Sequence, residues 1–474
     1  MDAVTEMVPA DMAETGAGLT MHLAARAAAT ALDALTPVAR TVVRHCVLDY
    51  LGCTLAGASE PLSLMLLGEM AEQGGTAQSS LIGHRARLPA ASAALVNGAA
   101  SHALDFDDVN MAMPGHPSVV ILPALLALAE ARAASGAAVA AAFAAGYELQ
   151  CRVGRLIAPG HYDGLGFHAT ATVGSFGAAA ACAHLLGLDA ERTAIALGIA
   201  ATQAAGLKSM FGTMCKPLHA GKAAYHGLLA ARLAARGFTS RTDALECNQG
   251  FARTHSPDFK PAAALADPGP DGYLRANLFK YHAACYLTHA PIEAARSLRL
   301  ARGVTPERIA RIVLRIDDAA DRICNIAAPR TGLECKFSLR QTIAMALTGV
   351  ETGALASYSE ALAADPVLAA LREKVSIDFQ TGWPHPKAAL DLHLTDGTVL
   401  TAAHDAGMPA ADLDEQGRRL EAKFMALAVP VIGEARAADA AALAARFDRL
   451  GEVGTLLGLC APPPGAGPAA SAAS

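Results

Sequence analysis

Residues 102–118 read HALDFDDVNMAMPGHPS, and the rest of the chain is organised around this stretch. Three carboxylates and two imidazoles fall within it, in a chain that is 53% hydrophobic. Residues 90–104 before it and 119–133 after it are apolar at helical spacing, and residues 110–115 contain the Pro-Gly pair typical of a turn. The sequence therefore predicts two helices joined by a polar loop.

The titratable side chains of this stretch indicate chemistry as well as structure. His102, Asp105 and Asp108 are spaced i, i+3, i+6, so a continuing helix would present them on roughly one face. His116 precedes the next helix, for which Ser118 is the expected N-cap. A helix start favours anions, so imidazole and carboxylate here would suit proton transfer beside a negatively charged substrate. A solvated helix end with an incidental histidine accounts for the pattern equally well.

Composition bounds the classes of protein that the chain can belong to. With 474 residues, two or more domains are expected, and abundant alanine with only 5% aromatic residues favours tightly packed helices. A net charge of −6 without a basic run argues against a nucleic-acid partner. Ten scattered cysteines without a C-x-x-C pair and an acidic N-terminus without a basic n-region indicate a cytoplasmic protein with reduced thiols. The apolar stretches 119–129 and 169–188 are too short or too polar to predict a membrane span.

Changes in the sequence pattern along the chain divide it into parts. Strand periodicity at 312–316 and 375–379, and a hairpin pattern around Asp396–Gly397, set a second region apart from the helical first one. The predicted fold class is α+β, predominantly α, with a large all-helical domain and an inserted smaller α+β domain. The predicted parts are a disordered leader (1–18), the large helical domain (19–265), the α+β domain (276–408, with a helix over 276–302), helices returning to the first domain (412–460) and a disordered tail (461–474). In the first domain, helices are predicted at 21–35, 38–55, 62–73, 90–107, 119–133, 138–156, 171–186, 190–205 and 220–236.

Four further polar clusters interrupt the apolar pattern. They read GLGFHATAT (164–172), FGTMCKPLHAGK (211–222), KYHAACYLTH (280–289) and KFSLRQ (336–341). Lys216 beside a proline at a helix start is a good anion anchor, whereas a lone histidine there is more often structural. The D-D-x-x-D pattern at residues 317–321 resembles a magnesium-binding motif. Because it follows a predicted strand, we interpret these acidic residues as the polar end of that strand.

Taken in order, the stretches HALDFDD…GHPS, GFHATATVGSFGAAAA, FGTMCKPLHAGKAA, KYHAACYLTH and KFSLRQTIAMAL resemble those of the MmgE/PrpD family. The resemblance runs from about residue 19 to residue 457. The family includes 2-methylcitrate dehydratases, cis-aconitate decarboxylases and iminodisuccinate epimerases. The resemblance implies that the α+β domain is a lid, that the active site lies in the cleft between the domains, that the protein is a homodimer, and that no metal or organic cofactor takes part.

The same resemblance implies the site residues. Catalytic roles fall on Asp105 in D-F-D-D, His116 in H-P-S, His168 in G-F-H, Lys216 in K-P-L-H and His289 in the late T-H pair. Substrate-binding roles fall on His102, Lys280, Ser338 and Gln341. Val109 stands where the decarboxylases have Thr, Tyr286 where others have Arg, and Gln341 where Tyr is common. These departures weigh against cis-aconitate decarboxylation and leave dehydration and epimerisation open.

The expected function is a cofactor-independent lyase that moves a proton at a carbon alpha to a carboxylate of a small di- or tricarboxylic acid. A 2-methylcitrate dehydratase-like hydro-lyase is the first expectation. The alternatives are an iminodisuccinate-type epimerase, a cis-aconitate decarboxylase and, less favoured, a non-catalytic carboxylate-binding protein. In this hypothesis Lys216, His168 and His289 bind the carboxylates and His116 exchanges the proton. Asp105 orients His116 and stabilises its imidazolium form.

Overall fold

The computed structural model describes residues 10–384 and 386–464. Two compact units are present, one comprising Met1–Phe279 and Asp412–Ser474, the other Lys280–Ala411. Of the predicted leader, residues 1–9 lie outside the described residues, whereas Ala10–Thr15 form helix α1. Of the predicted tail, residues 465–474 lie outside them as well.

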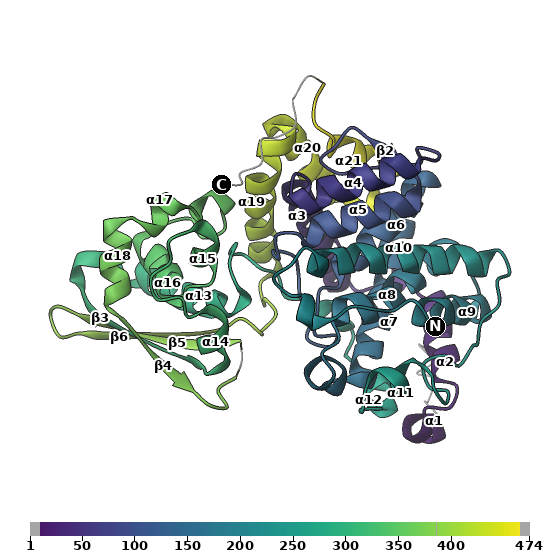
Figure 1. Cartoon of the computed structure of the whole chain (residues 1–474), viewed down its shortest axis with the longest axis horizontal. Helices are drawn as coiled ribbons and strands as arrows, with labels where there is room; N and C mark the ends of the chain where they lie inside the picture. The colour runs from purple at the N-terminus through teal and green to yellow at the C-terminus, as the bar shows by residue number, and fades with distance from the viewer. Residues whose placement is uncertain (1–9, 385, 465–474) are drawn as a thin grey trace. The chain divides into compact units, whose positions relative to one another are not determined.

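The first unit is built almost entirely of helices (Figure 1). Its longer helices are α2 (Leu19–Ala28), α3 (Pro37–Gly57), α4 (Pro61–Gln73), α5 (Ala90–His102), α6 (Ser118–Ala131), α7 (Gly136–Ile157), α8 (Ala169–Leu185), α9 (Ala190–Ala201), α10 (Cys215–Ala235), α19 (Leu413–Ile432) and α20 (Glu434–Ala444). Shorter ones are α11 (Phe251–His255), α12 (Pro261–Leu265) and α21 (Gly454–Leu459). A two-stranded pair, β1 (Ser79–Ser80) with β2 (Arg87–Leu88), is the one departure from the predicted all-helical pattern in the described part of this unit.

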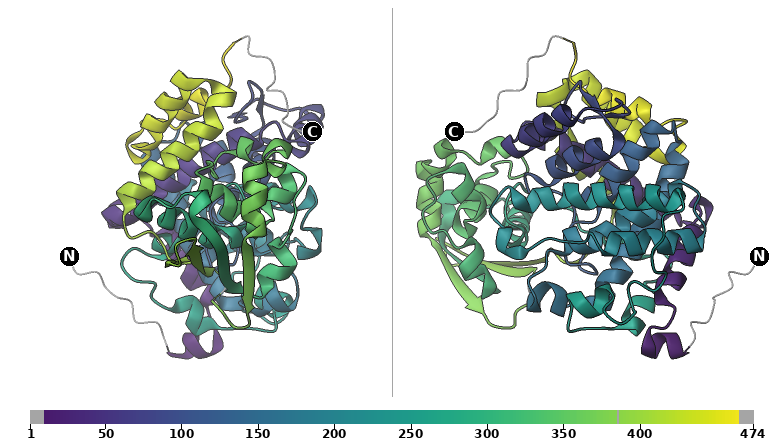
Figure 2. Two further views of the ribbon diagram at one scale, coloured as in Figure 1. Left: turned by 90° about the vertical axis from the view of Figure 1, so that its left-hand side faces the viewer. Right: turned by 45° about the vertical axis from the view of Figure 1, so that its right-hand side comes forward.

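Helix α8 lies at the centre of this unit, and its small side chains allow the neighbouring helices to pack closely against it. It packs against α7 on one side and α10 on another, and α8 and α10 run side by side in both figures (Figures 1 and 2). A side chain at Gly227 of α10 would come within 2.4 Å of the Ala178 methyl group, and one at Gly146 of α7 within 2.4 Å of the Gly177 carbonyl oxygen. The abundant alanine and glycine thus allow these helices to approach closely, as the composition predicted.

The C-terminal helices belong to the first unit. Helix α19 is capped by Asp412 and packs against α3. Its Lys423 is buried and donates to Asp49 Oδ1 and to the Phe106 carbonyl, both at 2.6 Å. Burial alone would lower the pKa of Lys423, but the surrounding acidic groups, of which Asp49 contributes most, together raise it. A residue more than three hundred positions away thereby fixes the loop that follows α5.

The second unit contains a four-stranded sheet with the order β4-β3-β5-β6. Strands β3 and β4 are parallel and the other pairs antiparallel, with helix α13 packed on β5 and β6 (Figure 1). The strands are β3 (Ile309–Asp317), β4 (Val375–Gln380), β5 (Lys387–Leu394) and β6 (Val399–Asp405), and the helices are α13 (His289–Arg302), α14 (Ala319–Cys324), α15 (Gly332–Lys336), α16 (Leu339–Thr348), α17 (Glu360–Ala363) and α18 (Pro366–Glu373). The predicted fold class, α+β and predominantly α, is confirmed.

Several predicted element boundaries were wrong. Helix α5 ends at residue 102 and not 107, and α10 begins at 215 and not 220. The helix α13 begins only at 289, after a short 3-10 helix at Tyr286–Thr288, whereas an α-helix was expected from 276. The hairpin turn spans residues 395–398 and is longer than the two residues predicted.

Within the described residues, no single helix has the length and apolar composition needed to cross a membrane. One bent pair, α3 with α4, passes that test only when its two helices are taken together across an 87° bend. Such pairs are weak evidence for a span, because buried helices pass the same test.

Candidate active site

The site in the first unit forms where α5 ends and where α8 and α10 begin. Helix α5 stops at His102, and Asp105 adopts a left-handed backbone with φ of 51°, which Asp tolerates better than most residues. The prediction that a continuing helix presents His102, Asp105 and Asp108 on one face is therefore wrong. The loop is held by the Lys423 contact, by paired backbone hydrogen bonds between Val109 and Leu278 at 2.8 Å, and by the His116 N–H, which donates to Thr170 Oγ1 of α8 at 3.1 Å.

Asp107 is the centre of the cluster. Its side chain is 1% exposed, and Oδ2 lies 2.9 Å from His102 Nδ1 and 2.9 Å from His116 Nδ1. The contact with His102 is a hydrogen bond, whereas the angle at His116 gives an ion-pair distance without hydrogen-bond alignment. Burial alone would raise the pKa of Asp107, but the two imidazoles outweigh it and hold the pKa well below the ordinary value. A buried carboxylate ion therefore bridges two histidines.

His102 is neutral in this arrangement. Burial lowers its pKa to about 4, although the Asp107 carboxylate acts in the opposite direction. Because the Asp107 carboxylate can only accept, Nδ1 of His102 carries the proton and Nε2 has the lone pair. Among the described residues this Nε2 has no hydrogen-bond partner. His102 thus keeps Asp107 ionised and in place.

Asp105 and Lys216 form the more exposed side of the cluster. Lys216 Nζ, in the first turn of α10, donates to Asp105 Oδ1 at 2.7 Å, and the two side chains are 15% and 46% exposed. His116 Nε2 lies 3.6 Å from the same Asp105 oxygen, and the His116 side chain is 12% exposed. The imidazole of His116 therefore faces a carboxylate at each ring nitrogen. Of the two carboxylates, Asp107 is the closer.

His168 lies beside this group as the N-cap residue of α8. Its ring stacks on that of His102 with centroids 5.9 Å apart, and its Nδ1 lies 3.1 Å from Nδ1 of His219, one turn along α10 from Lys216. Burial and the neighbouring cationic groups hold the pKa of His168 far below the ordinary value, so the ring is neutral. The exposed Phe211 ring contacts His168 edge-on, with centroids 4.9 Å apart, and borders the site with an apolar surface.

Asp108 has a structural role. It accepts from the Ser118 backbone N–H at 3.2 Å, from Ser118 Oγ at 2.5 Å and from Asn277 Nδ2 at 3.0 Å. Burial and the Asp49 charge raise the pKa of Asp108 to about 7. The N-cap residue of α6 is Pro117, so the prediction that Ser118 caps this helix was wrong. Asp108 accepts from the first backbone N–H of α6, which has no partner within the helix.

The remaining predicted site residues belong to the second unit. His289 is buried there beside His282, with ring centroids 5.1 Å apart, and burial lowers its pKa well below the ordinary value. Lys280 is 2% exposed. Ser338 caps α16 and donates to the Ile326 carbonyl at 2.6 Å, while Gln341 donates to the Leu362 carbonyl at 3.0 Å and accepts from Arg372. The roles of these four residues stay predictions.

The structure thus brings together five of the predicted residues: His102, Asp105, His116, His168 and Lys216. Sequence reasoning missed Asp107 as the bridging carboxylate because it assumed a helix through residue 107. It also missed His219, although the spacing of three residues from Lys216 on one helix could have indicated that the two share a face.

The donor set was compared with the needs of a metal ion. His102, Asp105, Asp107 and His116 offer ligand atoms that all lie within 4.8 Å of one another. Asp105, however, already accepts from the ammonium of Lys216, and a metal ion would have to compete with that cation. The arrangement of two carboxylates, two imidazoles and an ammonium therefore suits proton exchange beside an anion.

Two family models match most of the chain. The MmgE/PrpD N-terminal domain matches residues 21–264, and the MmgE/PrpD C-terminal domain matches residues 282–449. The chain is 34% identical over 310 residues to cis-aconitate decarboxylase of Homo sapiens, a match that spans 62% of each protein. It is 27% identical over 470 residues to cis-aconitate decarboxylase of Aspergillus terreus (93% of this chain and 96% of the relative), and 32% identical over 340 residues to that of Mus musculus (67% and 68%). With both domains matched in order, this chain belongs to the MmgE/PrpD family.

Proposed function

We propose that this chain is a lyase that decarboxylates cis-aconitate or a closely similar tricarboxylate without a metal ion. The observation that carries the proposal is the cluster that Asp107 and His116, in the loop between α5 and α6, form with Lys216 at the start of α10. The names of the relatives at 27–34% identity support the choice of substrate class.

The decarboxylation of cis-aconitate requires a proton donor and cationic groups. When cis-aconitate loses CO₂ from its CH₂ arm, the electron pair of the broken C–C bond forms a new double bond. The old double bond shifts its electrons to the neighbouring CH carbon, which takes up a proton and becomes CH₂. Because that carbon bears a carboxylate, negative charge develops next to an existing charge, and cations and N–H donors must stabilise it.

The residues of the cluster can supply both needs. Lys216 and the starts of α8 and α10 would bind substrate carboxylates, with His168 as a neutral hydrogen-bond partner. His116 would deliver the proton, since Nε2 faces the more exposed side of the cluster. We assign the orientation of His116 to Asp107, which lies 2.9 Å away, and not to Asp105 at 3.6 Å as first expected. Asp105 would instead position Lys216.

Dehydration of 2-methylcitrate is the second candidate. Val109, Tyr286 and Gln341 depart from the residues expected of a decarboxylase, which leaves dehydration open, and epimerisation as well. Here the same His116 would exchange the proton at the carbon beside a carboxylate while hydroxide leaves. The involvement of His289, like that of Lys280, rests on the resemblance alone.

Assembly and location belong to the same proposal. We expect a homodimer, for which light scattering after gel filtration would give twice the 48.4 kDa of one chain. A cytoplasmic location agrees with ten free thiols, which persist in reducing compartments. A monomer at micromolar concentration would contradict the assembly.

One experiment separates the candidates. The protein is incubated in deuterated water with cis-aconitate, 2-methylcitrate or iminodisuccinate, and product and label are followed by NMR. We expect CO₂ release from cis-aconitate and one deuterium in the new methylene group. Lys216→Met should lower kcat/KM by about a hundredfold or more, whereas Lys222→Met, which removes an exposed charge from the same helix, should leave it unchanged. Binding of these acids without turnover would overturn the proposal in favour of a carboxylate-binding protein.

A further inference from the structure

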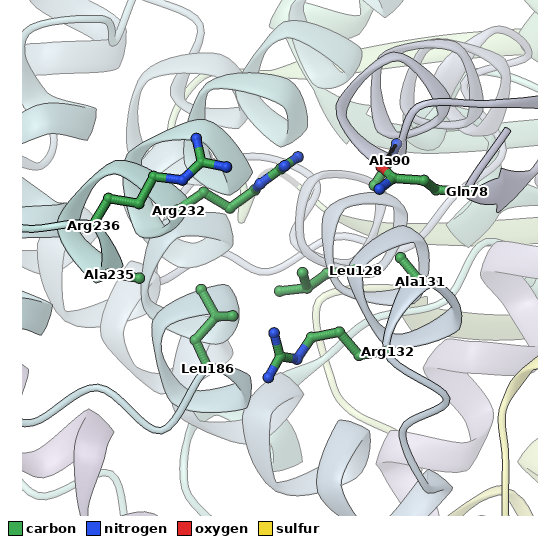
Figure 3. Close-up of a pocket in the computed structure, with 9 residues that line it drawn as sticks. All are labelled: Gln78, Ala90, Leu128, Ala131, Arg132, Leu186, Arg232, Ala235 and Arg236. Atoms are coloured by element: carbon green, nitrogen blue, oxygen red, sulfur yellow. Dashed lines mark hydrogen bonds between the residues drawn. The ribbon is translucent and has the colours of Figure 1, made fainter. Parts of the chain in front are cut away.

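A depression lined by arginine and apolar side chains lies in the first unit, remote from the cluster described above. It has a volume of about 270 Å³, and its lining includes Gln78, Leu128, Arg132, Leu186, Arg232 and Arg236 (Figure 3). We call it the arginine pocket. Figure 3 shows Arg232 and Arg132 extending from α10 and α6 on opposite sides of a space that has Leu128 between them.

The arginine pocket lies at the far ends of the helices that form the active site. The cluster uses the start of α10 and the pocket its last turn, so about 24–30 Å of helix, at 1.5 Å per residue, separates Lys216 from Arg232 and Arg236. The same is true of α6 and α8, which contribute their starts to one site and their ends to the other. Helix α5 runs the opposite way and contributes Ala90, its first residue, to the pocket. The two sites are therefore distinct and share four helices.

The pocket carries an uncompensated positive charge. Within the described part of the chain, no carboxylate forms an ion pair with Arg132, Arg232 or Arg236. The nearest acid in sequence, Glu130, is engaged by Arg87 at 2.6 Å and by Ser80. Three guanidinium groups around one depression repel one another, and an anion between them would remove that repulsion. In a chain of net charge −6, such a group is not explained by a general excess of basic residues.

A purely structural explanation covers only part of this arrangement. Arginines near helix ends stabilise the partial negative charge of the last carbonyl groups, and these three lie at the ends of α6 and α10. That effect does not require the side chains of two helices to meet across one space. It also leaves unexplained the opposite wall of the pocket, at the start of α5. There Gln78 Oε1 accepts from the Ala90 N–H at 3.2 Å, which leaves the amide nitrogen of Gln78 as a hydrogen-bond donor. Both walls therefore present hydrogen-bond donors to the same space.

We propose that the arginine pocket binds a small organic anion that carries at least two oxyanion groups. The planar guanidinium presents paired N–H donors that match phosphate and carboxylate oxygens. Leu128 and Leu186 provide apolar surface for the carbon part of the ligand. The volume of the arginine pocket admits a molecule of the size of citrate or pyrophosphate. The oxyanion groups of citrate are carboxylates, and those of pyrophosphate are phosphates.

Calorimetric titration of the full chain with pyrophosphate and with citrate, in buffers matched for ionic strength, tests the proposal. We expect saturable binding that Arg232→Gln weakens at least tenfold, whereas Arg192→Gln, which removes an exposed charge from α9, changes it less than twofold. Arg132→Gln provides a second variant on another helix, in case Arg232→Gln does not fold. Since citrate could also enter the active site, the titrations are repeated in Lys216→Met, where binding to the pocket should persist.

Tighter binding of pyrophosphate indicates a phosphate ligand, and tighter binding of citrate a polycarboxylate; either supports the proposal. Absence of saturable binding for both, loss of binding in Lys216→Met, or equal weakening by Arg192→Gln overturns it. Turnover of Arg232→Gln should equal that of the wild type, so this result is independent of the test of the proposed lyase activity.

Discussion

Replacement of Gly221 by Ala tests how the packing of the helices controls the site. Gly221 lies on α10 where that helix crosses α5. A Cβ atom there would lie 2.2 Å from the Leu95 carbonyl oxygen and 3.0 Å from the Ala99 nitrogen, both of them backbone atoms. The distance to the Leu95 oxygen falls roughly 1 Å short of ordinary van der Waals contact, so α5 and α10 must move apart by about that amount.

Two effects follow from this displacement. Overpacking costs about 1–3 kcal/mol or more, and the better helix propensity of Ala returns at most about 1 kcal/mol, so the variant should be less stable by about 2 kcal/mol. Because α5 carries His102 and α10 carries Lys216, the same displacement misplaces catalytic groups by about 1 Å, which lowers kcat by about a hundredfold. Thermal unfolding and steady-state kinetics on cis-aconitate measure both effects.

Gly68→Ala is the matched control. Gly68 is an exposed residue of α4, and a Cβ there would meet nothing within 4 Å. This variant should gain up to about 1 kcal/mol and keep the wild-type kcat. If Gly221→Ala were as stable and as active as the wild type, the argument from close helix packing would be refuted.

Three further predictions concern the charges of the site and the core. Asp107→Asn should lower kcat about a hundredfold to ten-thousandfold with a smaller change in KM, because the amide carries no negative charge and places an NH₂ donor where the carboxylate had an accepting oxygen; a near-normal rate would contradict its positioning role. Burial lowers the pKa values of His45, His102 and His161 from 6.5 to about 4. As the pH falls, these histidines therefore take up protons in the unfolded chain before they do so in the folded one. The free energy of unfolding should decrease between pH 6.5 and pH 4, by up to about 3 kcal/mol for each group. Urea unfolding at pH 7, 5.5 and 4.5 measures this, and a constant unfolding free energy would contradict it. Dialysis against EDTA should leave turnover unchanged, and a loss that added divalent ions restore would show that the cluster holds a metal ion.

Much of the fold could be predicted from the sequence because its cause is local. The 3.6-residue repeat of apolar side chains located α3 to α10, and the alternation at residues 312–316 located β3. The motifs around His116, His168 and Lys216 marked residues that the structure does bring together. Hydrophobic periodicity is set within a few residues of chain, so it can be recognised without the tertiary structure.

The conformation of the loop after α5 was decided only by the tertiary structure. The sequence alone predicted a helix through residue 107, whereas the Phe106 carbonyl is held by Lys423 and Val109 is paired with Leu278, contacts that come from distant parts of the chain. These contacts turn Asp105 toward Lys216 and place Asp107 between two histidines. By itself, the sequence determined which helices form and which polar groups stand at their ends. The choice of Asp107 as the bridging carboxylate depended on backbone hydrogen bonds and a buried ion pair that no local pattern encodes.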